Sequence, residues 1–251
     1  MSSVLENIDA MHIKTAVAHK YGEVATSPQT KFEFPVGLKF AQSVGYPAEL
    51  LSKLPSCLWE SFTGAGNPQP FMDISPGDVI LDLGCGAGLD VYLYAKATGE
   101  KGKVYGVDIS YEMITKAEKN MALMSIQNTK FSWAAADKIP LPDKSIDLIT
   151  ANGIYNLSPD KTAIMKEVLR LLKPGGRTIF AEIVLKEALP KENRRDMSAW
   201  FRCIGGALKE EDFLKRLNMC GFADPRILWK GRNARTGHPS ALCAVIRAEK
   251  V

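Results

Sequence analysis

Hydrophobic and polar positions divide the chain into two parts. The first ~75 residues alternate helical and irregular stretches and contain no strand-like run. From Asp78 onward, short apolar runs alternate with stretches in which apolar residues recur every three or four positions. The runs predict strands within 78–88, 103–110, 130–136, 145–153 and 177–185, and the periodic stretches predict helices at 89–99, 111–124 and 160–172.

This alternation predicts right-handed βαβ units and a mostly parallel sheet that helices cover on both faces. After Leu189 the chain is polar, then helical over 210–222, and it ends in two β-like runs at 226–231 and 243–250 that could pair as an antiparallel hairpin at the sheet edge. We therefore expect an α/β, Rossmann-like fold with a seven-stranded sheet. An N-terminal helical arm or lid (1–75) precedes the main domain (76–251), and an insertion around 186–210 would line the substrate.

Composition narrows the class of protein. The 251 residues are 46% hydrophobic and 24% charged, which suits one large globular domain, and the formal net charge of +4 is too small and too scattered for a nucleic-acid footprint. No apolar run approaches the ~18 residues of a membrane span, and the N-terminus does not resemble a secretion signal. Five dispersed cysteines without a CxxC pair indicate reduced thiols in a cytoplasm. The isolated histidines do not have metal-ligand spacing, so we expect no metal site.

The clearest chemical feature is a glycine-rich turn at the end of the first predicted strand. Gly84, Gly86 and Gly88 follow Asp82, where a strand should turn into a helix, and glycines there let a ligand approach the main chain. Asp108 ends the next strand, 20 positions past Gly88, where an acid can accept hydrogen bonds from both hydroxyls of a ribose. The GxGxG spacing differs from the GxGxxG dinucleotide fingerprint and suits a nucleoside with an amino-acid tail, whose positive charge Asp82 could offset.

These residues resemble the class I S-adenosylmethionine-dependent methyltransferases. The segments LDLGCGAG, VDIS, AAADKIPLPDKSIDLI and LKPGG match motifs of that family in order and spacing over roughly residues 76–185. The resemblance implies S-adenosylmethionine as cofactor and a class I methyltransferase fold.

The resemblance also assigns cofactor-binding residues. The glycines would flank the methionine and ribose, Cys85 would pack in the cofactor wall, Asp108 would bind the ribose, and Asn152 would line the methionine end. At the adenine edge the family commonly has an acid and a small residue where this chain has Ala135 and Ala136. Asp137 could substitute for the acid or be a solvated loop residue, and both readings stay open. Further contacts implied by the family are Ile109 and Met113 at the adenine. Tyr21, in a segment that generic members do not share, would help to close the cofactor pocket.

Within that superfamily the chain is most similar to the arsenite methyltransferase group, over almost its whole length. The matching segments include Tyr21-Gly22, VGYPAELLSKLP followed by GAGNP, NLSPDK at 156–161 and AWFRCIGGAL at 199–208. Arsenic(III) is thiophilic, and its capture needs two or three converging thiolates. Where the group has cysteines in GCGNP and NCVINL, this chain has Ala65 and Gly153, and its segment TSPQTKFEFPV lacks the cysteine that the group has in the N-terminal arm. Of the four cysteine positions only that of AWxxC is kept, as Cys203. Cys57 could partner it or be a packing residue. We expect the methyl acceptor to have changed.

Three residues are candidates for the acceptor side. Tyr155 could offer a hydroxyl or a ring face, Cys203 could contact substrate, and Glu182 ends the fifth strand, where ligands of α/β sheets lie. Each could equally serve packing or loop structure. Methyl transfer from a sulfonium chiefly needs positioning and exclusion of water, so a catalytic triad is not required.

The sequence therefore predicts a methyltransferase acting on a small-molecule acceptor, with neither a nucleic acid nor a membrane as partner and with its oligomeric state undetermined. Two alternatives stay open. One is an arsenite methyltransferase that uses Cys203 with external thiols, and the other is an S-adenosylmethionine-binding module without catalysis. A nicotinamide oxidoreductase is opposed by the GxGxG spacing.

Overall fold

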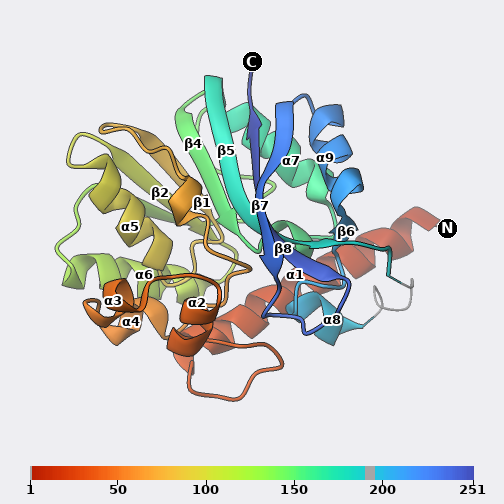
Figure 1. Cartoon of the computed structure of the whole chain (residues 1–251), viewed down its shortest axis with the longest axis horizontal. Helices are drawn as coiled ribbons and strands as arrows, with labels where there is room; N and C mark the ends of the chain where they lie inside the picture. The colour runs from red at the N-terminus through yellow and green to blue at the C-terminus, as the bar shows by residue number, and fades with distance from the viewer. Residues whose placement is uncertain (1, 190–195) are drawn as a thin grey trace.

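A central β-sheet organises the computed structural model of the protein, which describes residues 2–189 and 196–251 (Figure 1). In these residues the sheet has eight strands, in the order β3-β2-β1-β4-β5-β8-β7, and β6 pairs separately with β5. The strands are β1 (Val79–Leu83), β2 (Lys103–Asp108), β3 (Thr129–Trp133), β4 (Ile146–Asn152), β5 (Leu172–Leu185), β6 (Leu208–Lys209), β7 (Ala223–Arg232) and β8 (Ala241–Glu249).

The expected topology is confirmed. β1 to β5 pair in parallel, whereas β8 lies antiparallel between β5 and β7. The C-terminal hairpin thus forms the edge of the sheet. The prediction of seven strands omitted β6, which pairs in parallel with β5 over only two residues and is too short to leave a pattern in the sequence.

Helices cover both faces of the sheet, as the periodic stretches predicted, and local capping explains several of their ends. These helices are α5 (Leu89–Thr98), α6 (Tyr111–Leu123), α7 (Lys161–Leu171) and α9 (Glu210–Met219). The Ser110 hydroxyl accepts the Met113 N–H at 3.2 Å at the start of α6, and Asp160 caps α7 through the Ala163 N–H at 2.9 Å. Gly99 ends α5 with a φ of 72°, a conformation that favours glycine.

One boundary differs from the prediction. The Lys-Pro-Gly-Gly sequence was expected to separate the helix from the fifth strand, but α7 passes directly into β5 at Leu172. The pairing with β4 then jumps from Ile146–Leu172 to Leu148–Arg177, so residues 173–176 form an irregularity within the strand.

The N-terminal arm packs into the same hydrophobic core as the sheet. It contains α1 (Ser2–Thr26), α2 (Leu38–Ser43), α3 (Ala48–Ser52), α4 (Ser56–Trp59) and η1 (Gln69–Phe71), and Figure 1 shows it along the lower edge of the molecule. Phe40, Tyr46 and Leu51 from the arm share one buried cluster with Ile80 of β1 and Val245 of β8. A second cluster, on α7, α9 and the strands that they cover, contains Tyr155 of η2 (Tyr155–Leu157).

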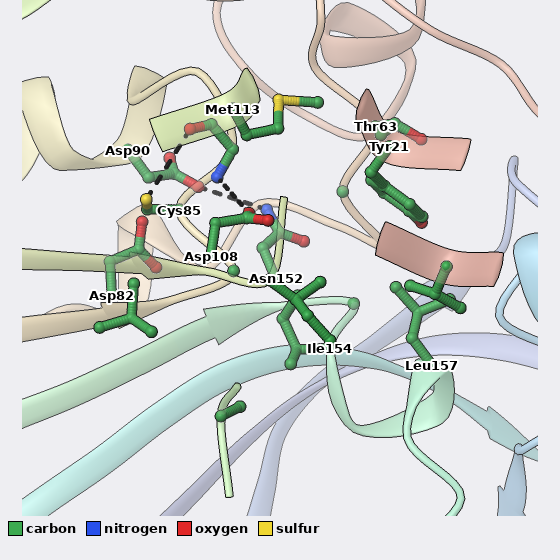
Figure 2. A pocket seen from close by; sticks show the side chains of 18 of the residues that line it. Tyr21, Thr63, Asp82, Cys85, Asp90, Asp108, Met113, Asn152, Ile154 and Leu157 are labelled. Atoms are coloured by element: carbon green, nitrogen blue, oxygen red, sulfur yellow. Dashed lines mark hydrogen bonds between the residues drawn. The ribbon is translucent and has the colours of Figure 1, made fainter. Parts of the chain in front are cut away.

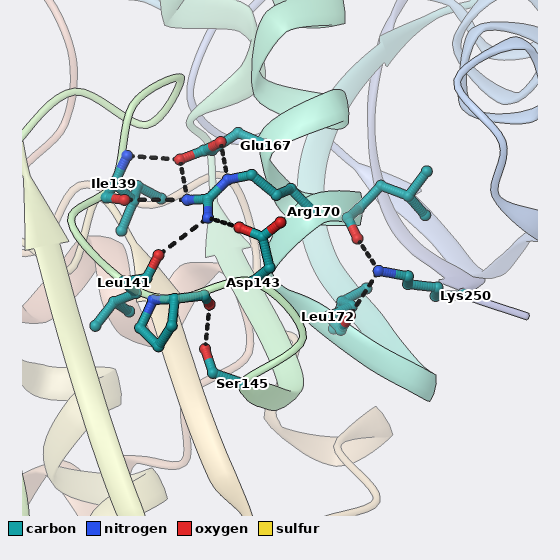
Figure 3. A network of polar contacts seen from close by, with 10 residues as sticks. Ile139, Leu141, Asp143, Ser145, Glu167, Arg170, Leu172 and Lys250 are labelled. Carbon is teal, nitrogen blue, oxygen red and sulfur yellow. Dashed lines mark hydrogen bonds and ion pairs between the residues drawn. The ribbon is translucent and has the colours of Figure 1, made fainter.

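The loop before β4 is held by a polar network around Arg170 of α7 (Figure 3). Its guanidinium donates to the carbonyls of Ile139 and Leu141 and forms ion pairs with Asp143 at 2.5 Å and Glu167 at 2.8 Å. Glu167 in turn accepts the Ile139 N–H at 2.6 Å. The network fixes the loop that follows residues 134–137, which border the cavity described below.

The segment expected to line the substrate, 186–210, is described only in part. Residues 190–195 lie outside the described residues, and the remainder contains α8 (Met197–Phe201) and β6.

Candidate cofactor site

A cavity lies at the carboxyl ends of β1, β2 and β4, under the N-terminal arm (Figure 2). It encloses about 1110 Å³, including its open mouth. Parallel strands end together at this edge of the sheet, and the reversal of strand order beside β1 leaves room for a ligand there. Every residue predicted to bind the cofactor except Gly88 lines the cavity, namely Tyr21, Asp82, Gly84, Cys85, Gly86, Asp108, Ile109, Met113, Ala135, Ala136, Asp137 and Asn152.

The glycine turn brings the main chain to the cavity. Gly84 has a φ of 66°, and a Cβ atom there would lie 1.9 Å from Cδ1 of Ile154, so both conformation and space require glycine. Gly88 has a φ of 90° and starts α5 without facing the cavity, with the side chain of Met121 3.2 Å from where its Cβ would be. Gly88 therefore shapes the turn and the packing of α5, while Gly84 and Gly86 form the wall.

Asp108 is held in position by the same turn. One carboxylate oxygen accepts the Gly86 N–H at 3.0 Å, and the other accepts the Ser110 N–H at 2.9 Å. Burial raises the pKa of this carboxyl to about 6, against the lowering effect of these backbone hydrogen bonds. Such a carboxylate is suited to accept hydrogen bonds from a pair of hydroxyl groups.

Two further buried carboxylates, those of Asp82 and Asp90, line the cavity near Asp108. Asp82 is 3% exposed and Asp90 is 8% exposed. Burial raises the pKa of both, and for Asp82 the neighbouring Asp90 and Asp108 raise it further. Buried acids this close together favour a cationic ligand, because a positive charge would stabilise their ionised forms.

Sequence reasoning missed Asp90. It lies two residues after the glycine turn, in the first turn of α5. The sequence pattern there indicates only a helix and does not mark this residue as part of a site. Its carboxylate accepts hydrogen bonds from Tyr46 Oη at 2.7 and 2.9 Å, from Gln69 Nε2 at 3.1 Å and from Asn152 Nδ2 at 3.4 Å. An acid two residues after a GxGxG turn was the sequence signal that could have identified Asp90.

Asn152 joins β4 to the arm. Its side-chain oxygen accepts the N–H groups of Ala65 at 2.7 Å and Gly66 at 3.1 Å, and its amide donates to the Gly66 carbonyl at 2.9 Å. The segment GAGNP is thereby docked against the end of β4. Ala65 also approaches Gly153, since a Cβ atom on Gly153 would lie 3.2 Å from the Ala65 nitrogen. Two positions where the arsenite group has cysteines thus meet here without a thiol.

The adenine-side residues predicted from the resemblance surround one end of the cavity. Ile109 and Met113 line it together with Ala135, Ala136 and Asp137. Asp137 forms an ion pair with Lys14 of α1, and both residues line the cavity. Neither reading of Asp137, adenine contact or solvated acid, anticipated this pairing with the arm.

The three acceptor-side candidates do not line the cavity. Tyr155 is fully buried, with its ring against Phe180 at 4.7 Å and Phe213 at 5.6 Å between centroids, and Thr178 is the polar neighbour of its hydroxyl. Packing against these two rings keeps Tyr155 in the core, in agreement with the packing alternative for this residue.

Cys203 and Glu182 lie behind the cavity wall. The Cys203 thiol donates to the carbonyl of Gly153 at 3.5 Å, and burial raises its pKa to about 11. Glu182 accepts the N–H groups of Ile183 at 2.9 Å and Asn156 at 3.2 Å, and burial raises its pKa to about 7. Both groups are thus bound to the segment that follows β4, and Glu182 lies within β5, which continues to Leu185 and does not end at Glu182 as expected. Direct contact with an acceptor would require the segment after β4 to move.

Tyr21 connects the cavity to a buried cation that the sequence did not single out. Its hydroxyl accepts a hydrogen bond from Arg235 Nη2 at 2.6 Å, and its ring stacks on Phe34 with centroids 5.8 Å apart. Among the neighbouring aromatic residues, Phe32, Phe34 and Phe201 pack with Tyr21, whereas Phe40, Trp59 and Trp200 pack in the main core.

Among residues 2–189 and 196–251, no group of three His, Cys, Asp or Glu side chains could hold a metal ion. Within the same ranges, no helix combines the length and apolar character that crossing a bilayer requires.

Comparisons with known proteins identify the family of the chain. Residues 74–221 match the family described as a methyltransferase domain. The arsenite methyltransferase of Halobacterium salinarum is 35% identical over 159 residues, 63% of this chain and 41% of that protein. The human arsenite methyltransferase is 34% identical over 158 residues, 59% of this chain and 42% of that protein. The matched region of this chain thus spans less than half the length of these two relatives.

A solved structure extends the likeness. CrArsM, an arsenic(III) S-adenosylmethionine methyltransferase from Chlamydomonas reinhardtii, superposes with a TM-score of 0.66 at 30% identity, over 84% of this chain and 72% of that chain. The glycine turn, the two strand-end acids and these matches lead to one conclusion: the chain belongs to the class I S-adenosylmethionine-dependent methyltransferases and is similar to their arsenite methyltransferase group.

Proposed function

We propose that this protein transfers a methyl group from S-adenosylmethionine to a small-molecule acceptor other than arsenite. The observation that carries the proposal is the charge pattern of the cavity: Asp108 is hydrogen-bonded to the glycine turn, and the buried acids Asp82 and Asp90 line the same cavity. S-adenosylmethionine carries a nucleoside, an ammonium group and a sulfonium, so its charges complement these acids.

The residues present fit this cofactor. Asp108 would accept hydrogen bonds from the ribose hydroxyls, and Ile109 and Met113 would pack on the adenine. Asp82 and Asp90 would balance the positive charges at the methionine end of the cofactor. S-adenosylmethionine supplies a methyl group on an activated sulfonium. The protein would position donor and acceptor in line and keep water out, and the apolar residues Ile154 and Leu157 of the cavity wall serve that exclusion.

The thiol chemistry argues against arsenite. Soft trivalent arsenic requires converging thiolates, but Ala65 and Gly153 carry no sulfur, and the raised pKa of Cys203 keeps its thiol protonated near neutral pH. Cys57 lies on α4, and its carbonyl accepts a hydrogen bond from Asn120 of α6 at 2.9 Å. It belongs to the contact between these helices.

A second candidate is arsenite methylation with Cys203 and an external thiol, which the identity to arsenite methyltransferases favours. The parts of the chain would share the work in both cases: residues 1–75 close the cavity, residues 76–251 bind the cofactor, and the insertion around 186–210 borders the acceptor.

The deciding experiment measures methyl transfer from labelled S-adenosylmethionine to arsenite in excess thiol, together with calorimetric cofactor binding. We expect micromolar-range cofactor binding, on the order of that for typical enzyme substrates, without methylated arsenic. Labelled small molecules in cell extract would then identify organic acceptors.

Matched variants separate the candidates. Methylated arsenic that disappears in both Cys203→Ser and Cys57→Ser would establish the arsenite enzyme and overturn the proposal. Tight cofactor binding with no label in any extract would instead indicate a binding module without catalysis.

A further inference from the structure

Arg235 is a buried cation in the loop between β7 and β8, far in sequence from the arm that it contacts. It is 3% exposed, and the Asn233 side chain accepts its backbone N–H at 2.8 Å. Burying a guanidinium costs free energy unless its N–H groups find hydrogen-bond acceptors. The contacts of Arg235 therefore show what its burial achieves.

The Arg235 guanidinium donates hydrogen bonds to several residues of the arm and to α8. Nη1 donates to the Thr63 carbonyl, to Thr63 Oγ1 at 2.6 Å and to the Gly64 carbonyl at 3.4 Å, whereas Nη2 donates to Tyr21 Oη at 2.6 Å and to the Phe201 carbonyl at 3.0 Å. The guanidinium carbon also lies 5.0 Å from the centroid of the Phe34 ring. One side chain thus joins α1, the segment before GAGNP and α8.

Three of the residues that accept hydrogen bonds from Arg235 form part of the cavity wall. Tyr21, Thr63 and Gly64 all line the cavity, and Figure 2 shows Tyr21 and Thr63 together on the side away from Asp82 and Asp90. Arg235 itself is not among the lining residues, and each of these hydrogen bonds ends on a neutral oxygen. The charge of Arg235 also lowers the pKa of the buried Glu182 carboxyl, against the larger effect of burial. The hydrogen bonds of the guanidinium, however, suit holding the wall in place.

We propose that Arg235 is a positioning residue for cofactor binding, one that presets the arm side of the cavity by fixing Tyr21 and residues 63–64 at once. The inference rests on the proposed binding of S-adenosylmethionine and goes beyond it, because it assigns part of the binding energy to a residue outside the cavity. A wall that is already ordered lowers the conformational cost of binding.

The fork itself is essential to this role. Arginine presents planar donors in two directions, so Nη1 reaches Thr63 while Nη2 reaches Tyr21. A lysine ammonium at the same place keeps the charge but has a single nitrogen. Arg235→Lys should therefore fail to restore the function that Arg235→Met loses.

The test is calorimetric titration of the full chain with S-adenosylmethionine and S-adenosylhomocysteine, at a temperature well below each variant's Tm. We expect Kd to rise at least about tenfold in both Arg235→Met and Arg235→Lys, in keeping with the sensitivity of sites to small misplacements. Hydrogen exchange of residues 17–26 and 61–66 should become faster in both variants. The control is Arg232→Met, an exposed arginine of β7 in the same hairpin, for which Kd should stay within about twofold.

The outcomes are distinguishable. A purely structural role would lower Tm but leave Kd of the folded variants unchanged, and that result would overturn the inference while the proposed function stands. Wild-type affinity in Arg235→Lys would also overturn it. If wild-type protein does not bind the cofactor, the proposed function and the inference fall together. Should Arg235→Met not fold, Tyr21→Phe and Thr63→Val test the same contacts one at a time, and each should raise Kd.

Discussion

At Asp108 two opposing influences act on one carboxyl group. Burial raises its pKa to about 6, while the N–H groups of Gly86 and Ser110 favour its charged form. Ribose hydroxyls would donate to the carboxylate, so cofactor binding requires the ionised acid. As pH falls through about 6, protonation competes with binding, and Kd should rise by up to about tenfold per pH unit.

Calorimetry between about pH 8 and about pH 5 checks this, with Asp108→Asn as the comparison. The variant should bind weakly already at the higher pH and lose part of the dependence near pH 6, while Asp82 and Asp90, whose pKa values are also raised, contribute the remainder. Identical pH profiles for both proteins would contradict the assignment of Asp108.

Tyr155 allows a second test at the scale of single residues. Its ring packs on Phe180 and Phe213 in the core, away from the cavity. Tyr155→Phe should therefore leave cofactor binding and methyl transfer unchanged and alter the free energy of unfolding by no more than about 1 kcal/mol. Tyr155→Ala should cost about 3–5 kcal/mol, because it removes a buried aromatic ring. Urea unfolding measures both values, and selective loss of methyl transfer in Tyr155→Phe would restore an acceptor role for the hydroxyl.

At the scale of secondary-structure elements, α7 is tied to the loop before β4 through Arg170 (Figure 3). The Arg170 guanidinium donates to the carbonyls of Ile139 and Leu141 and pairs with the carboxylates of Asp143 and Glu167. The substitution Arg170→Met removes these charged hydrogen bonds from the loop. We expect a loss of about 1.5–3 kcal/mol in unfolding free energy.

The matched control is Lys173→Met, which removes one partly exposed ion pair, with Asp147. Exposed pairs contribute little, so this change should cost less than about 1 kcal/mol. Urea denaturation of both variants decides the matter: equal losses would mean that the Arg170 network contributes no more than an ordinary surface pair.

At the scale of the whole molecule, the N-terminal arm is part of the core. Phe40, Tyr46, Leu51 and Leu58 are buried with residues of β1 and β8. A fragment of residues 76–251 would expose the apolar surface that these side chains cover, and we expect it to lack a cooperative thermal transition, in contrast to the full chain. Calorimetric scanning makes the comparison, and a cooperative transition near the Tm of the full chain would show that the arm is a separable lid.

The features of the fold and the site that were predicted from the sequence are those set by residues close together in the chain. The GxGxG turn and the acid that ends β2 are set by neighbours in the chain, since glycine conformation and strand periodicity need no distant contact. Strands β1 to β5 and the C-terminal hairpin were predicted for the same reason. The two residues of β6 were too few to produce a pattern, and the sequence did not show that α7 runs directly into β5, with an irregular register at residues 173–176.

By itself, the sequence determined the methyltransferase fold, the cofactor class and the absence of two family cysteines, at Ala65 and Gly153. Only the tertiary structure decided which side chains meet. It buried Tyr155 between two rings, brought Asp90 beside Asp82, and carried Arg235 across the molecule to Tyr21 and Thr63. The physical reason is that burial, pKa and the partners of a charged group depend on residues far apart in the chain, which no local pattern records.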